Sequence, residues 1–243
     1  MLTLLKKEIN SFFSSITGYI VIIVFLAINS LFMWVFSGNN NIIEGGYATL
    51  DSLFSIAPWV FLFLVPAVTM RMFADEKKSG TIEILFTRPL SDFQIIIAKY
   101  LAGLILVLFS ILPSLVYFYS VYQLGNPVGN IDLGGTWGSY IGLFFLAAIY
   151  VAIGILSSAF TENQIIAFIS AIFMSFIMYI GFDYLSDLGS LKAIGNLVIN
   201  LGINEHYKSM SRGVIDSRDM IYFISVIAFF LFITKTVLQS RKW

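Results

Sequence analysis

Few residues in this sequence have the types and neighbours that covalent chemistry needs. The chain of 243 residues has no cysteine and one histidine, His206, which excludes thiolate chemistry and a metal site built from cysteine and histidine. Ser157 and Ser158 are adjacent, but the surroundings of His206 lack the pattern of a serine triad. We therefore disfavour a serine hydrolase and interpret His206 as a polar residue at the outer surface.

Nucleotide and nucleic-acid chemistry are also poorly supported. No G-x-x-x-x-G-K-[ST] motif occurs, so the chain cannot bind ATP through a P-loop. The apolar stretches contain no pair of carboxylates that would suit an aspartyl protease within a membrane. Formal net charge is zero, which leaves no basic excess for a nucleic acid. We expect a chain that is not an enzyme and binds no metal, cofactor or nucleic acid.

The densest polar motif lies in residues 71–95, and its chemistry is that of recognition. A charged cluster at residues 75–78 is followed by a break at Ser79 and Gly80. The pattern after the break predicts a short helix over Thr81–Phe86, whose apolar residues recur at the i, i+3, i+4 spacing of one helix face. Arg88 and Pro89 end this helix. A capping box, S-x-x-Q at residues 91–94, starts the next one.

A short amphipathic helix of this kind can dock a cytosolic partner, because apolar anchors fill a groove while the surrounding charges set the register. The alternative is a solvated loop with ordinary charges beside a membrane. The candidate docking residues are Asp75, Glu76, Lys77, Lys78, Gly80, Thr81, Ile82, Glu83, Leu85, Phe86, Arg88 and Pro89.

The rest of the composition indicates a membrane protein. Hydrophobic residues make up 58% of the chain and charged residues only 12%, against about 25% charged residues in soluble domains. Mean hydropathy is +0.89. A soluble protein of this length needs more charge to cover its outside, so the outside must face lipid.

Six apolar runs are long enough to cross about 30 Å of hydrocarbon and contain no Asp, Glu, Lys or Arg. Their cores are residues 18–36, 53–70, 100–121, 140–160, 165–182 and 220–234, the last reaching 238 if Lys235 extends toward the inner surface. The fold class expected is therefore an all-α integral membrane protein with six transmembrane helices in a single domain, residues 1–243.

The distribution of Lys and Arg predicts the orientation. Ten of the 14 lie in residues 1–17, 71–99, 161–164 and the tail from 235, whereas the opposite set of segments contains only four. Because cytoplasmic segments carry the excess of Lys and Arg, both termini are expected in the cytoplasm.

Three shorter segments carry further expectations. Residues 1–16 have helical apolar spacing with Lys6, Lys7, Glu8 and Asn10 opposite, as in a helix lying in the membrane interface.

The sequence of residues 183–219 predicts a broken helical segment at the outer leaflet. Within it, helical spacing is kept by Leu191, Ile194, Val198 and Leu201. Asp216 and Asp219 then form an N-terminal cap and an acidic first turn for the last span. Thr161 and Gln164 have capping-box spacing, which predicts a tight hairpin between spans four and five.

The loop motif Glu76-Lys77-Lys78-x-Gly80-Thr81-Ile82-Glu83, with Pro89 and Lys99 after it, resembles the cytoplasmic signature of the permeases of ABC-2 type transporters. The resemblance covers the whole chain. It implies that the loop helix is the coupling helix that contacts the ATP-binding subunit, and that residues 1–16 form the family's interfacial connecting helix. It also implies a bacterial inner-membrane location, with a second permease copy or paralogue as partner and ATP and Mg on the separate ATPase.

A closer resemblance is to the gliding-motility-associated ABC transporter permease of Bacteroidetes bacteria. It is carried by residues 57–59, 65–71, 129–134, 162–165, 206–207, 213–219 and 241–243. The stretch Phe86-Thr87-Arg88 departs from many relatives, in which leucine is commoner. The alternative class is a membrane anchor that recruits an ATPase complex without moving a substrate.

Overall fold

The computed structural model describes residues 1–87, 89–186 and 195–240. Helices account for nearly all of the regular structure there, and these residues contain no strand. The helices are α1 (Leu2–Phe13), α2 (Ile16–Ser30), α3 (Ile42–Gly45), α4 (Asp51–Thr69), α5 (Arg71–Lys78), α6 (Thr81–Phe86), α7 (Asp92–Ile111), α8 (Leu115–Leu124), α9 (Leu133–Phe160), α10 (Gln164–Phe176), α11 (Phe182–Ser186), α12 (Gly195–Ile199), α13 (Ile203–Ser211) and α14 (Ser217–Ser240), with short π or 3-10 segments at Leu31–Val35, Leu112–Ser114 and Ile177–Gly181.

Six helical stretches are long and apolar enough to cross a membrane, which confirms the six predicted spans. Several extend beyond the predicted cores, because a helix continues past the last apolar residue wherever its polar ends reach an interface. The stretches are Ile16–Val35, Asp51–Lys78, Asp92–Leu124, Leu133–Phe160, Gln164–Ser186 and Ser217–Ser240.

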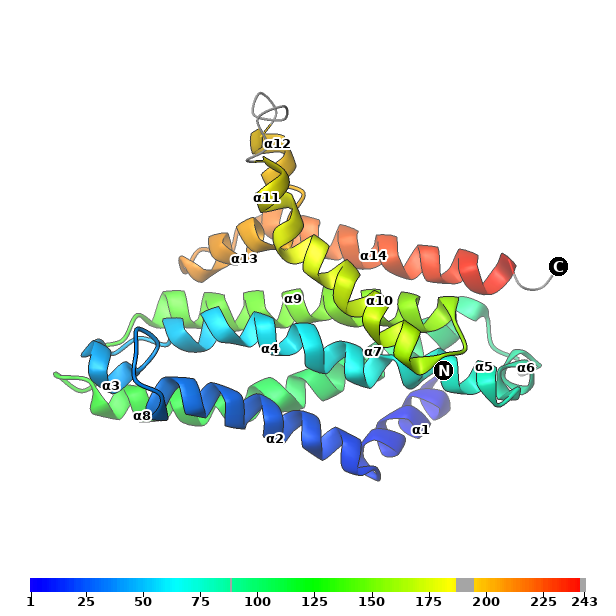
Figure 1. The fold of residues 1–243 in the computed structure, drawn as a ribbon, viewed down its shortest axis with the longest axis horizontal. Helices are drawn as coiled ribbons and strands as arrows, with labels where there is room; N and C mark the ends of the chain where they lie inside the picture. Colours follow the sequence, from blue (N-terminus) through cyan, green and yellow to red (C-terminus); the bar gives the residue numbers. More distant parts are fainter. Residues whose placement is uncertain (88, 187–194, 241–243) are drawn as a thin grey trace.

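Helix α9 is the centre of the bundle, with α4, α7, α10, α13 and α14 packed around it (Figure 1). In its apolar stretch 83% of the residues are buried, compared with 28% for the first span, 22% for the fifth and 28% for the last. The three peripheral spans therefore leave broad apolar surfaces for lipid or for another protein chain.

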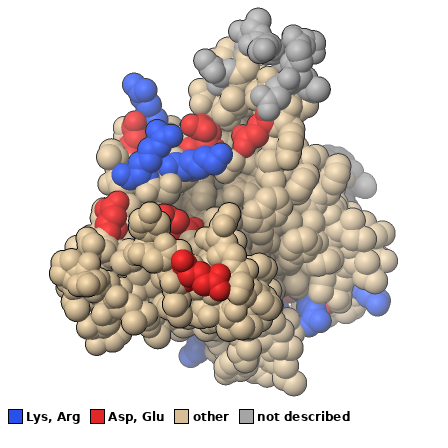
Figure 2. All heavy atoms as spheres, turned by 60° about the vertical axis from the view of Figure 1, so that its left-hand side comes forward, with Lys and Arg blue, Asp and Glu red and all other residues tan. Residues whose placement is uncertain are grey.

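Charged side chains avoid the long sides of the bundle. Figure 2, which brings the α3 and α13 end of Figure 1 forward, shows Lys, Arg, Asp and Glu gathered in groups on a surface that is otherwise uncharged. A second set of charges, on Lys7, Glu8 and Glu76, belongs to α1 and α5. These helices lie toward the opposite end of the bundle (Figure 1). This distribution suits a protein whose middle lies in hydrocarbon.

The segment before the last span is broken into short helices, as expected. Helices α11 and α12 project from the bundle, and α13 lies along the end of α9 (Figure 1). Leu191 and Ile194 lie outside the described residues. Close packing of α13 on α9 needs glycine, because a Cβ on Gly138 would lie 2.2 Å from the carbonyl oxygen of Met210.

His206 was expected to be a polar residue at the outer surface, and the structure shows in addition that its ring has close partners. Its imidazole is partly buried and stacked on Tyr222, with ring centroids 3.8 Å apart. Nδ1 lies 2.7 Å from Oδ1 of Asp219, and Nε2 lies 2.9 Å from the carbonyl oxygen of Asn200. Asp219 therefore lies in the first turn of α14, as predicted, and is also buried against α13. Asp216 accepts a hydrogen bond from the backbone N–H of Arg218, as the predicted cap of α14 should.

Two predicted capping boxes have different outcomes. Ser91 and Gln94 form theirs at the start of α7, each side chain bonding the other's backbone. Thr161 and Gln164 do not: Asn163 is the N-cap of α10, and Thr161 accepts from the backbone N–H of Asn163 instead. Asparagine is at least as good a cap as threonine, and its position starts α10 two residues later than a cap at Thr161 would.

Candidate docking site and the ion cluster behind it

The predicted loop helix is present as α6, at the end of the bundle farthest from α3 (Figure 1). Helix α5 continues the second span and ends at Lys78. The hydroxyl of the capping residue Ser79 donates to the carbonyl oxygen of Asp75 at 2.7 Å. Gly80 then takes a φ of +72°, with no atom near its missing side chain. The left-handed backbone is thus the reason for glycine at this turn.

The apolar residues of α6 do not all face outward. Ile82 and Leu85 are partly buried and pack against the hydrophobic core of their own chain. Ile84 is 59% exposed, and Glu83 beside it is exposed too. The exposed surface of α6 therefore includes Ile84 and Glu83. Glu83 was among the predicted docking residues, whereas Ile84 was not.

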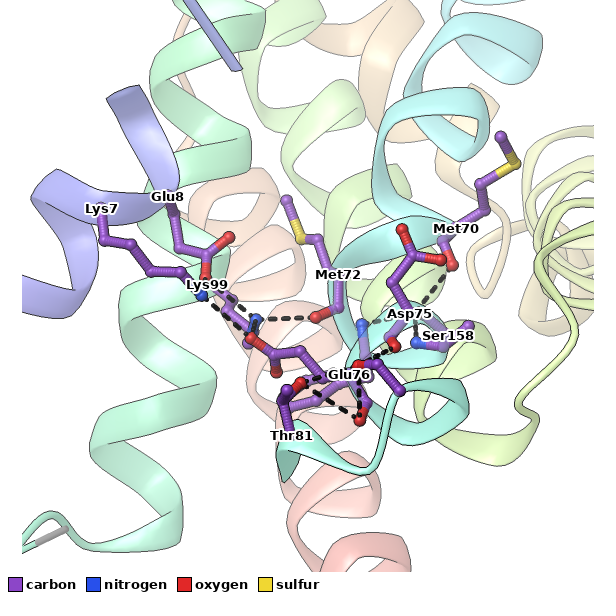
Figure 3. A network of polar contacts seen from close by, with 12 residues as sticks. Lys7, Glu8, Met70, Met72, Asp75, Glu76, Thr81, Lys99 and Ser158 are labelled. Carbon is purple, nitrogen blue, oxygen red and sulfur yellow. Dashed lines mark hydrogen bonds and ion pairs between the residues drawn. The ribbon is translucent and has the colours of Figure 1, made fainter. Parts of the chain in front are cut away.

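Helix α5 connects α6 to the bundle and is held by the central helix. Ser158 of α9 is fully buried, and its hydroxyl oxygen accepts from the backbone N–H groups of Phe73 and Ala74 at 2.8 and 3.0 Å. The same hydroxyl donates to the carbonyl oxygen of Met70 at 3.0 Å (Figure 3). One serine therefore satisfies the backbone where α4 passes into α5, a place at which the helical ladder is interrupted.

Two further side chains of α5 reach the hairpin between spans four and five. Lys77 is buried and donates to the carbonyl oxygen of Ala159 at the end of α9. Asp75 accepts from the side-chain amide of Gln164, the first residue of α10. The orientation of α5 is thus set by contacts to both helices of this hairpin.

An ion cluster on the opposite side of α5 includes a lysine that is almost completely enclosed. The side chain of Lys99 on α7 is 1% exposed, and its Nζ lies 3.1 Å from Oε1 of Glu8 and 3.0 Å from Oε1 of Glu76. It also donates to the carbonyl oxygen of Met72 at 2.7 Å (Figure 3). The ammonium group therefore donates to Glu8 and to the backbone of Met72, and Glu76 adds a second counter-charge, which is the condition for burying such a charge.

Lys7 completes this ion cluster of Lys7, Glu8, Glu76 and Lys99. Its Nζ lies 3.3 Å from Glu8 and 3.2 Å from Glu76, so that two cations and two carboxylates balance. Partial burial lowers the pKa of the Lys7 ammonium group, but the two carboxylates outweigh it and the net pKa is raised. Because a raised pKa favours the charged form, Lys7 remains charged at neutral pH, and its contribution to stability is lost only in strongly basic solution.

The cluster corrects two expectations. Glu8 was assigned to the polar side of the N-terminal helix, yet it is buried with Leu4 on the face of α1 that packs on α7. Lys99 was counted with the cytoplasmic residues 71–99 before the core of span three, yet its side chain is enclosed inside the bundle. Both differences arise because an ion pair lets charged residues occupy a buried face that apolar spacing alone assigns to hydrophobic residues.

The remaining predicted residues have simple positions. Lys78, Gly80, Thr81, Glu83 and Pro89 are exposed around α6. Arg88 and the side chain of Phe86 lie outside the described residues.

The structure adds to the predicted set four residues that sequence reasoning did not place there, namely Glu8, Lys99, Ser158 and Gln164. For Lys99 a signal existed, because an ionisable residue at the edge of an apolar run calls for a partner.

Comparison with known proteins agrees with this architecture. The family model described as ABC-2 family transporter protein matches residues 6–211, which include α6, its stem α5 and every residue of the ion cluster. No curated protein matches the chain significantly. Because the matched region covers most of the chain and contains five of the six apolar spans, this multi-pass membrane protein belongs to the ABC-2 transporter family.

Proposed function

We propose that this chain is the permease subunit of an ABC transporter and that α6 is the helix on which its separate ATPase docks. Permeases of this family generally work with an ABC ATPase. One observation carries the proposal: α6 presents Ile84 and Glu83 to solvent at the end of a stem whose other contacts are all to the bundle. Such an exposed apolar residue flanked by charge is what a partner groove can bind.

The contacts of α5 suggest how movement of α6 reaches the membrane spans. On one side Ser158, Lys77 and Gln164 connect the stem to α9 and α10. On the other, Glu76 connects it to α7 and α1 through Lys99. When the ATPases close on ATP, a displacement of α6 is therefore transmitted to four helices at once, because buried and paired contacts do not slide independently.

The orientation and location follow from the charge distribution. The α6 end is proposed to be cytoplasmic, with both termini on that side and the chain in a bacterial inner membrane. A second permease copy or paralogue covers part of the apolar surface left by the peripheral spans. ATP and Mg bind to the partner ATPase, since the sequence has no P-loop. Gliding motility is the proposed process, on the strength of the motif resemblance alone.

Transport can be separated from the alternative, a membrane anchor for the ATPase, by measuring whether ATP moves the spans. Spin labels at Phe63 on α4 and Phe173 on α10, both more than half exposed, report the distance between two spans. In the complex with the ATPase, ATP with vanadate should change this distance relative to the nucleotide-free state. An unchanged distance together with normal ATPase binding would identify the chain as an anchor.

A further inference from the structure

A cavity of about 230 Å³ opens between α1 and α5, beside the ion cluster and next to the start of the first apolar stretch at Ile16. Its walls combine apolar Phe12, Val68 and Met72 with the hydroxyl groups of Ser11, Ser15 and Thr17. We propose that this cavity binds the headgroup of a zwitterionic aminophospholipid, phosphatidylethanolamine, with its phosphate at Arg71 and its ammonium group at the carboxylates of α5.

In this proposal the phosphate group of the lipid binds to Arg71. Its guanidinium group donates to the hydroxyl of Thr17 at 3.3 Å and forms no ion pair with any described residue. Four of its five N–H donors therefore remain for a phosphate, which a guanidinium group binds with two parallel hydrogen bonds. Ser11 on the neighbouring α1 and Ser15 in the turn after it add hydroxyl groups to the same wall.

The ammonium group of the lipid binds at the acidic side of the cavity. Asp75 forms no ion pair with a described residue, and its amide partner Gln164 is neutral. Glu76 uses one carboxylate oxygen for both lysines, and the other oxygen is enclosed with no hydrogen-bond partner among the described residues. A donor entering the cavity can supply the missing hydrogen bonds once this carboxylate rotates.

Charge balance selects a zwitterion over a simple anion. Three cations, Lys7, Arg71 and Lys99, and three carboxylates, Glu8, Asp75 and Glu76, line the cavity. A phosphate alone would have to approach these carboxylates without compensation, as would the headgroup of phosphatidylglycerol. Phe12 and Val68 give the cavity an apolar wall as well, which suits the start of the acyl chains of a phospholipid.

The test measures lipid binding to the delipidated full-length chain in detergent by native mass spectrometry, without the ATPase. The probes are dihexanoyl phosphatidylethanolamine, phosphatidylglycerol and phosphatidylcholine, and inorganic phosphate. Phosphatidylethanolamine should bind about tenfold more tightly than the others, because phosphatidylglycerol lacks the ammonium group and the quaternary nitrogen of phosphatidylcholine has no N–H to donate.

Variants locate the site. Arg71→Gln should weaken phosphatidylethanolamine binding about tenfold, and Asp75→Asn should reduce the preference over phosphatidylglycerol. Lys6→Gln is the matched control, because Lys6 is exposed on α1 and does not line the cavity. Equal binding of all three lipids, tighter binding of phosphatidylglycerol, effective competition by inorganic phosphate, or an Arg71→Gln protein that behaves like the control would each overturn the proposal. Unchanged elution and thermal unfolding of the variants establish that they are folded.

Discussion

At the scale of single residues, we expect the buried charge of Lys99 to be costly to disturb. Its ammonium group is enclosed, and both of its carboxylate partners are themselves largely buried. Removing one member of a buried ion pair leaves the opposite charge without a counter-ion or water, and this commonly costs about 3–5 kcal/mol.

Lys99→Met should therefore lower the free energy of unfolding by about 3–5 kcal/mol, because Glu8 and Glu76 are left with only Lys7. Adding Glu8→Gln should recover part of the loss by removing an uncompensated charge. Thermal unfolding of the purified protein in detergent measures both effects. Lys6→Met is the matched control, as Lys6 is exposed on the same helix as Glu8. A Lys99→Met protein as stable as this control would show that the pair is not a structural element.

Among single residues, some contacts could be predicted from the sequence and others could not. The break at Gly80 and the cap at Ser91 were predictable, because each depends on neighbours within three residues. The partner of Lys99 was not, since Glu8 is 91 positions away and lies on a helix whose polar side was expected to face water. Spacing reveals which face a residue is on but not which charge it meets across an interface.

At the scale of the elements, two close approaches determine how the helices pack on α9. A Cβ on Gly154 would lie 2.0 Å from Oγ1 of Thr69 on α4, and one on Gly138 would lie 2.2 Å from a backbone carbonyl oxygen of α13. The second is the more restrictive, because a backbone atom cannot move by rotating a side chain.

Gly138→Ala should therefore separate α13 from α9 and destabilise the protein by about 1–3 kcal/mol. The measurement is the midpoint of thermal unfolding in detergent. Gly45→Ala provides the comparison: its added Cβ would meet nothing within 4 Å and its φ is not positive, so stability should be unchanged or slightly higher. Equal midpoints for the two variants would contradict the packing described for α13.

Element prediction succeeded where local pattern and burial agree. Helix α6 has the predicted bounds, Thr81–Phe86, because Gly80 starts it and the following residues have helical spacing. Its orientation could not be predicted: whether Leu85 faces a partner or its own core depends on how α5 leaves the bundle, and that is set by Ser158, far along the chain. The sequence of α6 alone is consistent with either arrangement.

At the scale of the whole molecule, the first question is which end lies in the cytoplasm. From the count of Lys and Arg we proposed that the α6 end lies there and the α3 end lies outside. Because the chain has no cysteine, single cysteines report position without background. Ser79→Cys and Ser37→Cys, exposed at the two ends, should be labelled by a membrane-impermeant reagent from opposite sides of the membrane. Labelling of both from the same side would overturn the proposed orientation.

The central claim is that the ATPase docks on α6, and the most direct measurement is its affinity for α6 variants. Ile84→Ala should weaken binding of the cognate ABC ATPase to the detergent-purified chain by about thirtyfold, the effect of losing about 2 kcal/mol at an interface anchor. Ile43→Ala, which removes an equally exposed isoleucine from the short helix α3 at the other end, should change binding by less than about 0.5 kcal/mol. Glu83→Lys should weaken binding as well. If Ile84→Ala and Glu83→Lys both bind the ATPase as tightly as Ile43→Ala does, α6 is not the docking helix.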